Sequence, residues 1–126
     1  MKAATRDWIR KAEGDYLAAL ALSRRRKVPL HDQVCFHCEQ SAEKYLKARL
    51  EEAGIFSPKT HDLERLLALV TNIEPLWSSL RLRLKRLTDY AVDFRYPGNE
   101  ATAQEAKTAL ADCKAIRKEA RAALHL

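Results

Sequence analysis

The sequence predicts an all-α protein: an up-and-down four-helix bundle with an additional short helix, five helices in all. Apolar residues recur with the helical period along nearly all of the 126 residues, and no run alternates apolar and polar residues as a strand would. Only three glycines and four prolines interrupt the chain, so we expect few, long elements. This length supports one hydrophobic core, and residues 1–126 are therefore expected to form a single helical domain.

Three helices are expected in the first part of the chain. The first runs from about Thr5 to Arg26 and is broken at Val28-Pro29, because proline bars a continuing helix. The second runs from about Asp32 to Ala53, where Gly54 suits a C-terminal cap. A shorter third helix begins within "SPKTHDLERLLALV", capped by Ser57 or Thr60.

Two further helices are expected in the second part. Pro75 suits the first residue of a helix that continues to about Phe94, with a core stripe of Leu76, Leu80, Leu84, Leu87, Ala91 and Phe94. The stretch "RYPGN" ends that helix, and the last one runs from about Glu100 to Leu124. The four long helices can pack as an antiparallel bundle, with the short helix in the connection before the helix from Pro75.

Composition excludes some classes of protein. No stretch approaches the roughly 20 uncharged apolar residues of a membrane span, and Met1 to Arg10 does not read as a signal peptide. Three cysteines without a secreted spacing pattern favour a reducing cytoplasm. A net charge of +6 permits binding to nucleotide or RNA phosphates, and also to an acidic partner protein.

The segment "CFHCEQSAEKYLKARL" holds two cysteines three residues apart, which raises the question of a metal site. At 100° per residue, Cys35 and Cys38 fall on the apolar side of the helix, whereas His37 points away from them. No second pair of ligands follows, as a zinc knuckle would need. We therefore expect buried cysteines that act as small hydrophobes, no metal ion and no cofactor.

The same helix carries a polar stripe opposite the cysteines, formed by Gln33, His37, Gln40, Lys44 and Lys47. Such a stripe is typical of the solvated face of an outer helix. Phe36 lies beside the stripe and off the apolar side, so we expect an exposed aromatic ring there. An exposed phenylalanine favours a partner surface, most simply that of a homodimer.

The first helix contains a carboxylate on its apolar face. Trp8, Ala12, Asp15, Ala19 and Leu22 step by four and three residues, which places Asp15 within the stripe. A buried carboxylate without a partner costs several kcal/mol, so Asp15 needs a cation or a hydrogen-bond donor. The candidates are Lys44, His61 and Arg95. Arg95 also stands at the end of its helix beside Tyr96, a combination suited to phosphate or base recognition or to anchoring a loop.

Taken together, these segments resemble the HEPN domain (higher eukaryotes and prokaryotes nucleotide-binding), in the branch found beside minimal nucleotidyltransferases. The matching stretches are distributed over most of the chain in the family's order: "DWIRKAEGDYLAAL", "CFHCEQSAEKYLKARLEEAGI", "PKTHDLERLL" and "LTDYAVDFRYPG". The resemblance implies an up-and-down helical bundle, homodimers formed through helix faces, and binding of nucleotides or RNA. It also implies pairing with a nucleotidyltransferase chain in the manner of a toxin–antitoxin pair.

The resemblance also implies which positions form the family pattern: Asp15, Phe36, Gln40, Glu43, Lys44, Lys47, His61, Asp62, Tyr90, Arg95, Tyr96 and Pro97. Ribonuclease members of the wider family carry an arginine followed after four to six residues by a histidine, near the end of a late helix. After Arg95 the next histidine is His125, which is too distant. Arg24, Arg25 and Arg26 precede His31 at permitted spacings, but they lie in the first loop. This departure speaks against nuclease activity.

The sequence therefore predicts a cytoplasmic homodimer of HEPN type that binds a nucleotide or RNA phosphate and partners a separate nucleotidyltransferase. Lys44, Lys47, His61 and Arg95 are the expected anion contacts; Asp15 and Gln40 orient them, Tyr96 stacks on a base, and Phe36 lies in the dimer interface. One alternative is a metal-independent endoribonuclease, with His61 or His37 as the acid–base group and Arg95 stabilising phosphate charge. The other is a protein-interaction module without nucleotide binding.

Overall fold

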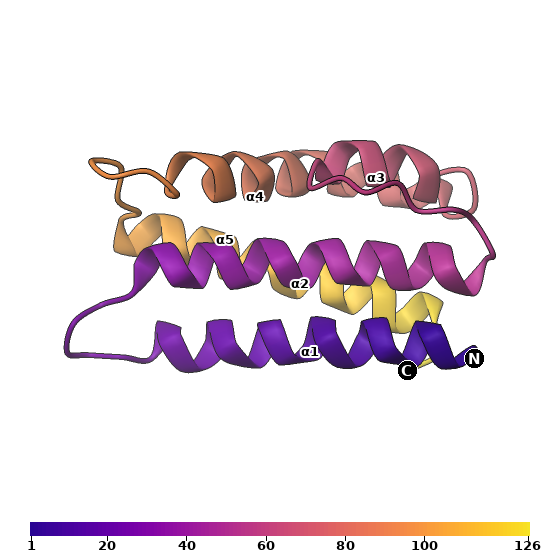
Figure 1. The fold of residues 1–126 in the computed structure, drawn as a ribbon, viewed down its shortest axis with the longest axis horizontal. Coiled ribbons are helices and arrows are strands. Elements are labelled where there is room, and N and C mark those ends of the chain that lie inside the picture. Colours follow the sequence, from indigo (N-terminus) through magenta and orange to yellow (C-terminus); the bar gives the residue numbers. More distant parts are fainter.

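The computed structural model describes residues 1–126 and contains five α-helices with no strand, which confirms the predicted fold class. The helices are α1 (Ala3–Ser23), α2 (His31–Glu52), α3 (Leu63–Val70), α4 (Arg81–Asp93) and α5 (Ala103–Ala123). The four long helices run up and down, so that both chain termini lie at one end of the bundle (Figure 1). No helix combines the length and apolar character needed to cross a membrane.

Helix α2 lies at the centre of the bundle and packs against α1, α3, α4 and α5. Its apolar side chains Val34, Cys35, Cys38, Ala42, Tyr45 and Leu46 are all buried, as expected. Glu39, Ser41 and Glu43 are buried as well, so the helix has almost no fully solvated face. The expected solvated stripe is therefore wrong for most of its length: only Gln33 is fully exposed, while His37, Gln40, Lys44 and Lys47 are half-buried.

Helix α2 ends at the predicted glycine. Gly54 has a φ of 70°, a left-handed conformation that glycine adopts without the steric cost of a side chain. Its N–H donates to the Glu51 carbonyl, and the N–H of Ile55 donates to the Leu50 carbonyl, each at 3.0 Å. These two bonds are the Schellman motif, which satisfies carbonyls that the helix itself leaves free.

The cap of α3 differs from the prediction. Asp62, rather than Ser57 or Thr60, is the N-cap, and its Oδ1 accepts from the N–H of Glu64 at 3.0 Å and of Arg65 at 3.4 Å. Thr60 instead accepts from the N–H of Asp62 at 3.1 Å. A carboxylate therefore occupies the positive end of the α3 dipole.

The helix predicted from Pro75 to Phe94 is two elements, because Pro75–Leu80 forms a 3₁₀-helix before α4 begins. With three residues per turn, Trp77 and Leu80 face the core, whereas Leu76 is 88% exposed. The placement of Leu76 in the core stripe was thus wrong. The other stripe residues are fully or partly buried: Leu80, Leu84, Leu87, Ala91 and Phe94.

Helix α5 begins three residues later than expected, because Thr102 and Glu105 form a capping box. Before it, the N–H of Ala101 donates to the Asp32 carboxylate at 2.7 Å, which fastens the α4–α5 connection to the start of α2. Within α5, Asp112 is fully buried and accepts hydrogen bonds from Arg83 and Arg86 of α4. These contacts fix α4 relative to the rest of the bundle.

Candidate functional site

Two adjoining clefts lie between α2 and the second half of α4. One measures about 150 Å³ and the other about 250 Å³, and they share Phe36, Ala91 and Arg95. We refer to both together as the α2–α4 groove, lined by Asp32, Phe36, Glu39, Gln40, His61, Thr88, Tyr90, Ala91, Val92, Phe94 and Arg95. The groove combines one exposed cation, a histidine, an amide and several aromatic rings.

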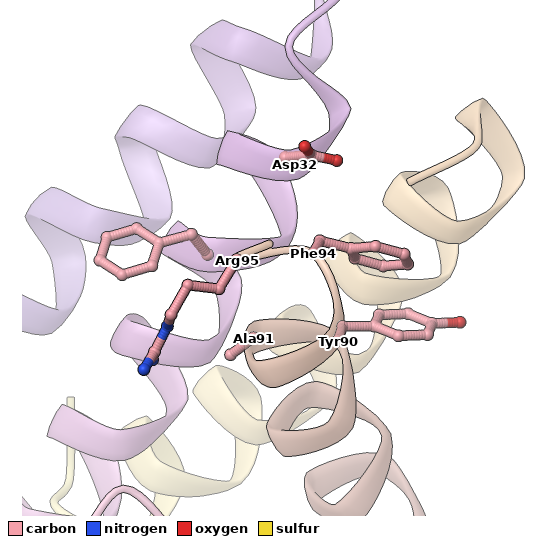
Figure 2. Close-up of a pocket in the computed structure, with 6 residues that line it drawn as sticks. Asp32, Tyr90, Ala91, Phe94 and Arg95 are labelled. Carbon is pink, nitrogen blue, oxygen red and sulfur yellow. The ribbon is translucent and has the colours of Figure 1, made fainter. Parts of the chain in front are cut away.

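Arg95 reaches the groove because α4 ends just before it. The Phe94 N–H bonds to the Tyr90 carbonyl at 3.0 Å, and the two rings pack with centroids 5.3 Å apart, which anchors the end of the helix. Figure 2 shows the Arg95 side chain extending away from these two rings. Arg95 is exposed, and its guanidinium has neither an ion pair nor a side-chain hydrogen bond within the chain. Its donors are free for a ligand.

His61 projects into the groove from the connection between α2 and α3. Its Nδ1 lies 2.8 Å from Glu43 Oε1, while its side chain is 78% exposed. The carboxylate thereby orients the imidazole and leaves Nε2 directed to solvent. The other oxygen of Glu43 accepts from Lys47 Nζ at 3.1 Å, so Glu43 is paired on both sides.

Glu39 lies one helical turn before Glu43 and is 2% exposed. Gln40 Nε2 donates to its Oε2 at 2.8 Å, whereas Oε1 has no hydrogen-bond partner. Burial raises the pKa of Glu39 to about 7, with a further rise from the nearby Glu43 carboxylate against the lowering effect of Gln40. This carboxyl therefore titrates close to neutral pH, unlike an ordinary glutamate.

Asp15 is paired, as the sequence required, but not in the groove. Its Oδ2 accepts from Lys44 Nζ at 2.5 Å and its Oδ1 lies 2.9 Å from His37 Nδ1. Of the three candidate partners, Lys44 is confirmed, whereas His61 and Arg95 make no contact with it. This cluster joins α1 to α2 and consists of groups that satisfy one another.

The predicted anion contacts are therefore divided between two places. Gln40, His61 and Arg95 line the groove, together with Phe36. Lys44 is paired with Asp15, and Lys47 bonds Glu43 and lies 5.5 Å from the centre of the Trp8 ring. Neither lysine lines the groove. The start of α3 offers no anion site beside His61 either, because the Asp62 carboxylate accepts from the N–H groups of Glu64 and Arg65 and His61 precedes the helix.

Two aromatic predictions have different outcomes. Phe36 is 47% exposed, as expected, and lines both clefts of the groove. Tyr96 is 59% exposed but does not line the groove. The free cysteines Cys35, Cys38 and Cys113 are buried, and His37 points to Asp15 rather than to them, which confirms the prediction that Cys35 and Cys38 are buried with His37 turned away.

Sequence reasoning overlooked Glu39. Cys35, Glu39, Ala42 and Leu46 step by four, three and four residues, which places Glu39 within the apolar stripe of α2. The same argument that singled out Asp15 would have found it. Glu43 belonged to the pattern that the resemblance implied, but its pairing with His61 depends on a loop that no helical period places.

Comparison with known proteins agrees with this architecture. The crystal structure of TT1696 from Thermus thermophilus superposes with a TM-score of 0.83 at 24% identity, over 95% of this chain and 98% of that one. That likeness defines the class: an up-and-down helical bundle of the same fold. The chain itself matches the HEPN domain over residues 5–123, and it belongs to that family. No curated protein matches the sequence. The HEPN family comprises helical domains whose functions involve nucleotides or RNA, and this chain is one of its members.

Proposed function

We propose that the chain binds the phosphate groups of a nucleotide or of RNA in the α2–α4 groove, with Arg95 as the principal contact. The observation that carries this proposal is the free guanidinium of Arg95 at the rim of a groove. The arginines of α4 itself, Arg81, Arg83 and Arg86, are all paired with carboxylates, and Arg95 is not. A guanidinium with five free donors suits a phosphate, which accepts two parallel hydrogen bonds.

The other groove residues support recognition of a nucleotide. His61 presents Nε2, and the Gln40 amide retains one N–H after its bond to Glu39. In this proposal Tyr96 lies beyond the groove and can contact only a ligand that extends past Arg95.

The charge of the chain favours an anionic ligand. The net charge is +6, and the connection between α1 and α2 carries Arg24, Arg25, Arg26 and Lys27. Figure 1 places this connection at the same end of the bundle as the connection that follows α4. This basic connection attracts phosphate at long range, and the attraction weakens as salt is added.

A binding titration with three variants tests the proposal. Fluorescently labelled single-stranded RNA and ATP would be titrated at 50 and 200 mM salt. We expect Arg95→Ala to weaken binding about tenfold, as for the loss of a charged hydrogen bond worth roughly 1.5–3 kcal/mol. Arg65→Ala removes an exposed, unpaired arginine on α3 and serves as the control. Lys44→Ala should change affinity less than threefold, because Lys44 is held by Asp15.

Either of two results would refute the proposal. One is a parent chain that binds neither RNA nor ATP at 50 mM salt. The other is an Arg95→Ala variant that binds like the parent. The protein-interaction alternative would then be favoured, in which the basic surface docks an acidic partner.

A second candidate function is cleavage of RNA, and one observation favours it. His61 and Arg95 line the same cleft, and Glu43 holds the imidazole so that Nε2 is free for proton transfer. Arg95 would stabilise charge on the phosphate. The test is to incubate labelled RNA with the chain in the presence of EDTA. Cleavage by the parent that is lost in His61→Ala supports this function, and RNA that stays intact excludes it.

The proposal includes two partners. One is a second copy of the chain, supported by Phe36 and by Val92, which is 50% exposed, on the same groove. The other is a minimal nucleotidyltransferase chain in a toxin–antitoxin pair, supported by the sequence resemblance to that branch of the family. Co-expression with a nucleotidyltransferase encoded beside the gene tests the second partner by co-purification.

A further inference from the structure

Two buried carboxylates and one histidine meet at the α2–α4 groove: Glu39 and His61 line it, and Glu43 lies beside them. Glu39 and Glu43 are four residues apart on α2, so their side chains lie on one face of the helix. His61 approaches them from the connection between α2 and α3. One ligand atom from each of these three residues lies within 4.8 Å of the other two.

This cluster is short of positive charge. Glu39 and Glu43 are 2% and 4% exposed, and Lys47 is the one lysine or arginine bound to either carboxylate; His61 adds a positive charge only when it is protonated. Glu39 Oε1 has no partner, although a buried polar group of this kind normally has one. An isolated buried carboxylate costs several kcal/mol, so the cluster requires a proton or a cation.

We propose that Glu39, Glu43 and His61 form a binding site for one divalent transition-metal ion, with Zn²⁺ as the best fit. Two carboxylate oxygens and one imidazole nitrogen are a ligand set suited to Zn²⁺, and the imidazole disfavours Mg²⁺, which prefers oxygen ligands and water. Three protein ligands leave a fourth position open for water or for a ligand in the groove.

The geometry needs only a local adjustment. Zinc binds oxygen and nitrogen at roughly 2.0–2.2 Å, so two ligands of one tetrahedral ion lie about 3.3 Å apart. His61 Nδ1 and Glu43 Oε1 are already 2.8 Å apart. All three ligand atoms lie within 4.8 Å of one another, so no pair has to shorten by more than about 1.5 Å. The exposed His61 side chain can move by that amount, and the adjoining cleft of about 250 Å³ gives it room.

In the metal-bound form His61 contributes Nδ1 to the ion, and its contact with Glu43 becomes shared coordination. Nε2 remains free. Because one coordination position is also open, the metal site is compatible with a phosphate held by Arg95 in the same groove. Such a phosphate would occupy the open coordination position. Metal binding itself requires no nucleotide and is independent of the proposed function.

The experiment uses the full chain without a histidine tag, stripped with EDTA and then dialysed against micromolar Zn²⁺. We expect one zinc per chain by elemental analysis and a higher melting temperature with Zn²⁺ than with Mg²⁺. Glu39→Gln and His61→Ala should each weaken zinc affinity at least tenfold. Glu51→Gln, the same substitution on the same helix outside the cluster, should bind zinc like the parent.

His61→Ala removes a mostly exposed side chain and Glu39→Gln keeps the shape of the side chain, so both variants should fold; circular dichroism checks this. A parent chain that retains clearly less than one zinc per chain would overturn the proposal. A proton shared by Glu39 and Glu43 would then compensate their charge in place of a metal ion. Zinc bound equally by the parent, Glu39→Gln and His61→Ala would also overturn it, because the ion would then sit elsewhere, for instance on the cysteines. Neither result depends on whether RNA or nucleotide binds.

Discussion

The ion pair between α4 and α5 allows a sharp prediction about what holds the groove in shape. Asp112 is fully buried; Arg86 forms two bonds to it, from Nε at 2.7 Å and from Nη2 at 2.8 Å, and Arg83 forms one at 3.0 Å. Arg86→Met removes the two-bond contact and leaves the carboxylate in the core with one donor. The methionine preserves most of the apolar contact of the arginine stem.

The expected cost follows from these contacts. Breaking a buried pair from one side costs about 3–5 kcal/mol. The Arg86 side chain is 39% exposed and Arg83 remains bonded, so we expect the lower end, about 3 kcal/mol, or a drop of about 10 °C in melting temperature. Arg83→Met should cost only about 1 kcal/mol, because it removes one bond from a carboxylate that Arg86 still satisfies.

Urea unfolding followed by circular dichroism measures these free energies, and a double variant tests the cause. Asp112→Asn added to Arg86→Met removes the uncompensated buried charge, so the double variant should be more stable than Arg86→Met alone. Arg81→Met is the control, since its pair with Glu64 is largely exposed and should contribute less than about 1 kcal/mol. A double variant less stable than Arg86→Met would refute the argument that the stranded charge causes the loss.

Three further predictions concern other groups. Burial alone would raise the pKa of Glu13. Hydrogen bonds from Arg117 and Tyr45, together with the charges of Arg117 and Arg121, outweigh burial and lower the pKa of Glu13. Ionised Glu13 therefore stabilises the fold at pH values above its ordinary pKa of 4.5, and this stabilisation is lost in acid. Glu13→Gln should thus lower stability by roughly 1–3 kcal/mol at pH 7 and by clearly less at pH 3, as measured by urea unfolding. With EDTA present, Glu39→Gln should stabilise the fold at pH 8 by up to about 3 kcal/mol and have little effect at pH 4.5. The reason is that a pKa of about 7 keeps Glu39 protonated only at the lower pH. Equal effects on stability at the two pH values would contradict this prediction. Phe36→Asp should convert a dimer into a monomer in sedimentation velocity, whereas a parent chain already monomeric at tens of micromolar would remove the basis for a Phe36 interface.

Much of the fold could be predicted because it depends on local signals. The helical period, the prolines and Gly54 indicated the number and order of the helices, and most helix boundaries were predicted within a few residues; the start of α4, six residues later than expected, is the exception. The errors have local causes too. The choice of Asp62 over Thr60 as the cap of α3 depends on which side chain reaches the free N–H groups. The 3₁₀ turn at Pro75–Leu80 changed the period and turned Leu76 outward.

The candidate site was predicted only in part. Asp15 had to be paired, because a carboxylate on an apolar face demands a partner, and Lys44 was among the partners named. Gln40, His61 and Arg95 were singled out and line one groove. The separation of Lys44 and Lys47 from that groove was not foreseen, because a shared stripe on one helix does not say which neighbouring helix each side chain meets.

The sequence by itself determined that this chain is an all-α bundle of the HEPN family, which residues lie on apolar faces, and which charges need partners. These follow from periodicity and from the cost of burying a charge, and both act within one helix. Only the tertiary structure decided that α2 is surrounded by four other helices, that His61 meets Glu43, and that Arg95 remains unpaired. Those outcomes depend on how far one helix slides and rotates against another and on the path of a loop. The packing of the whole core sets these quantities, and no period in the sequence records them.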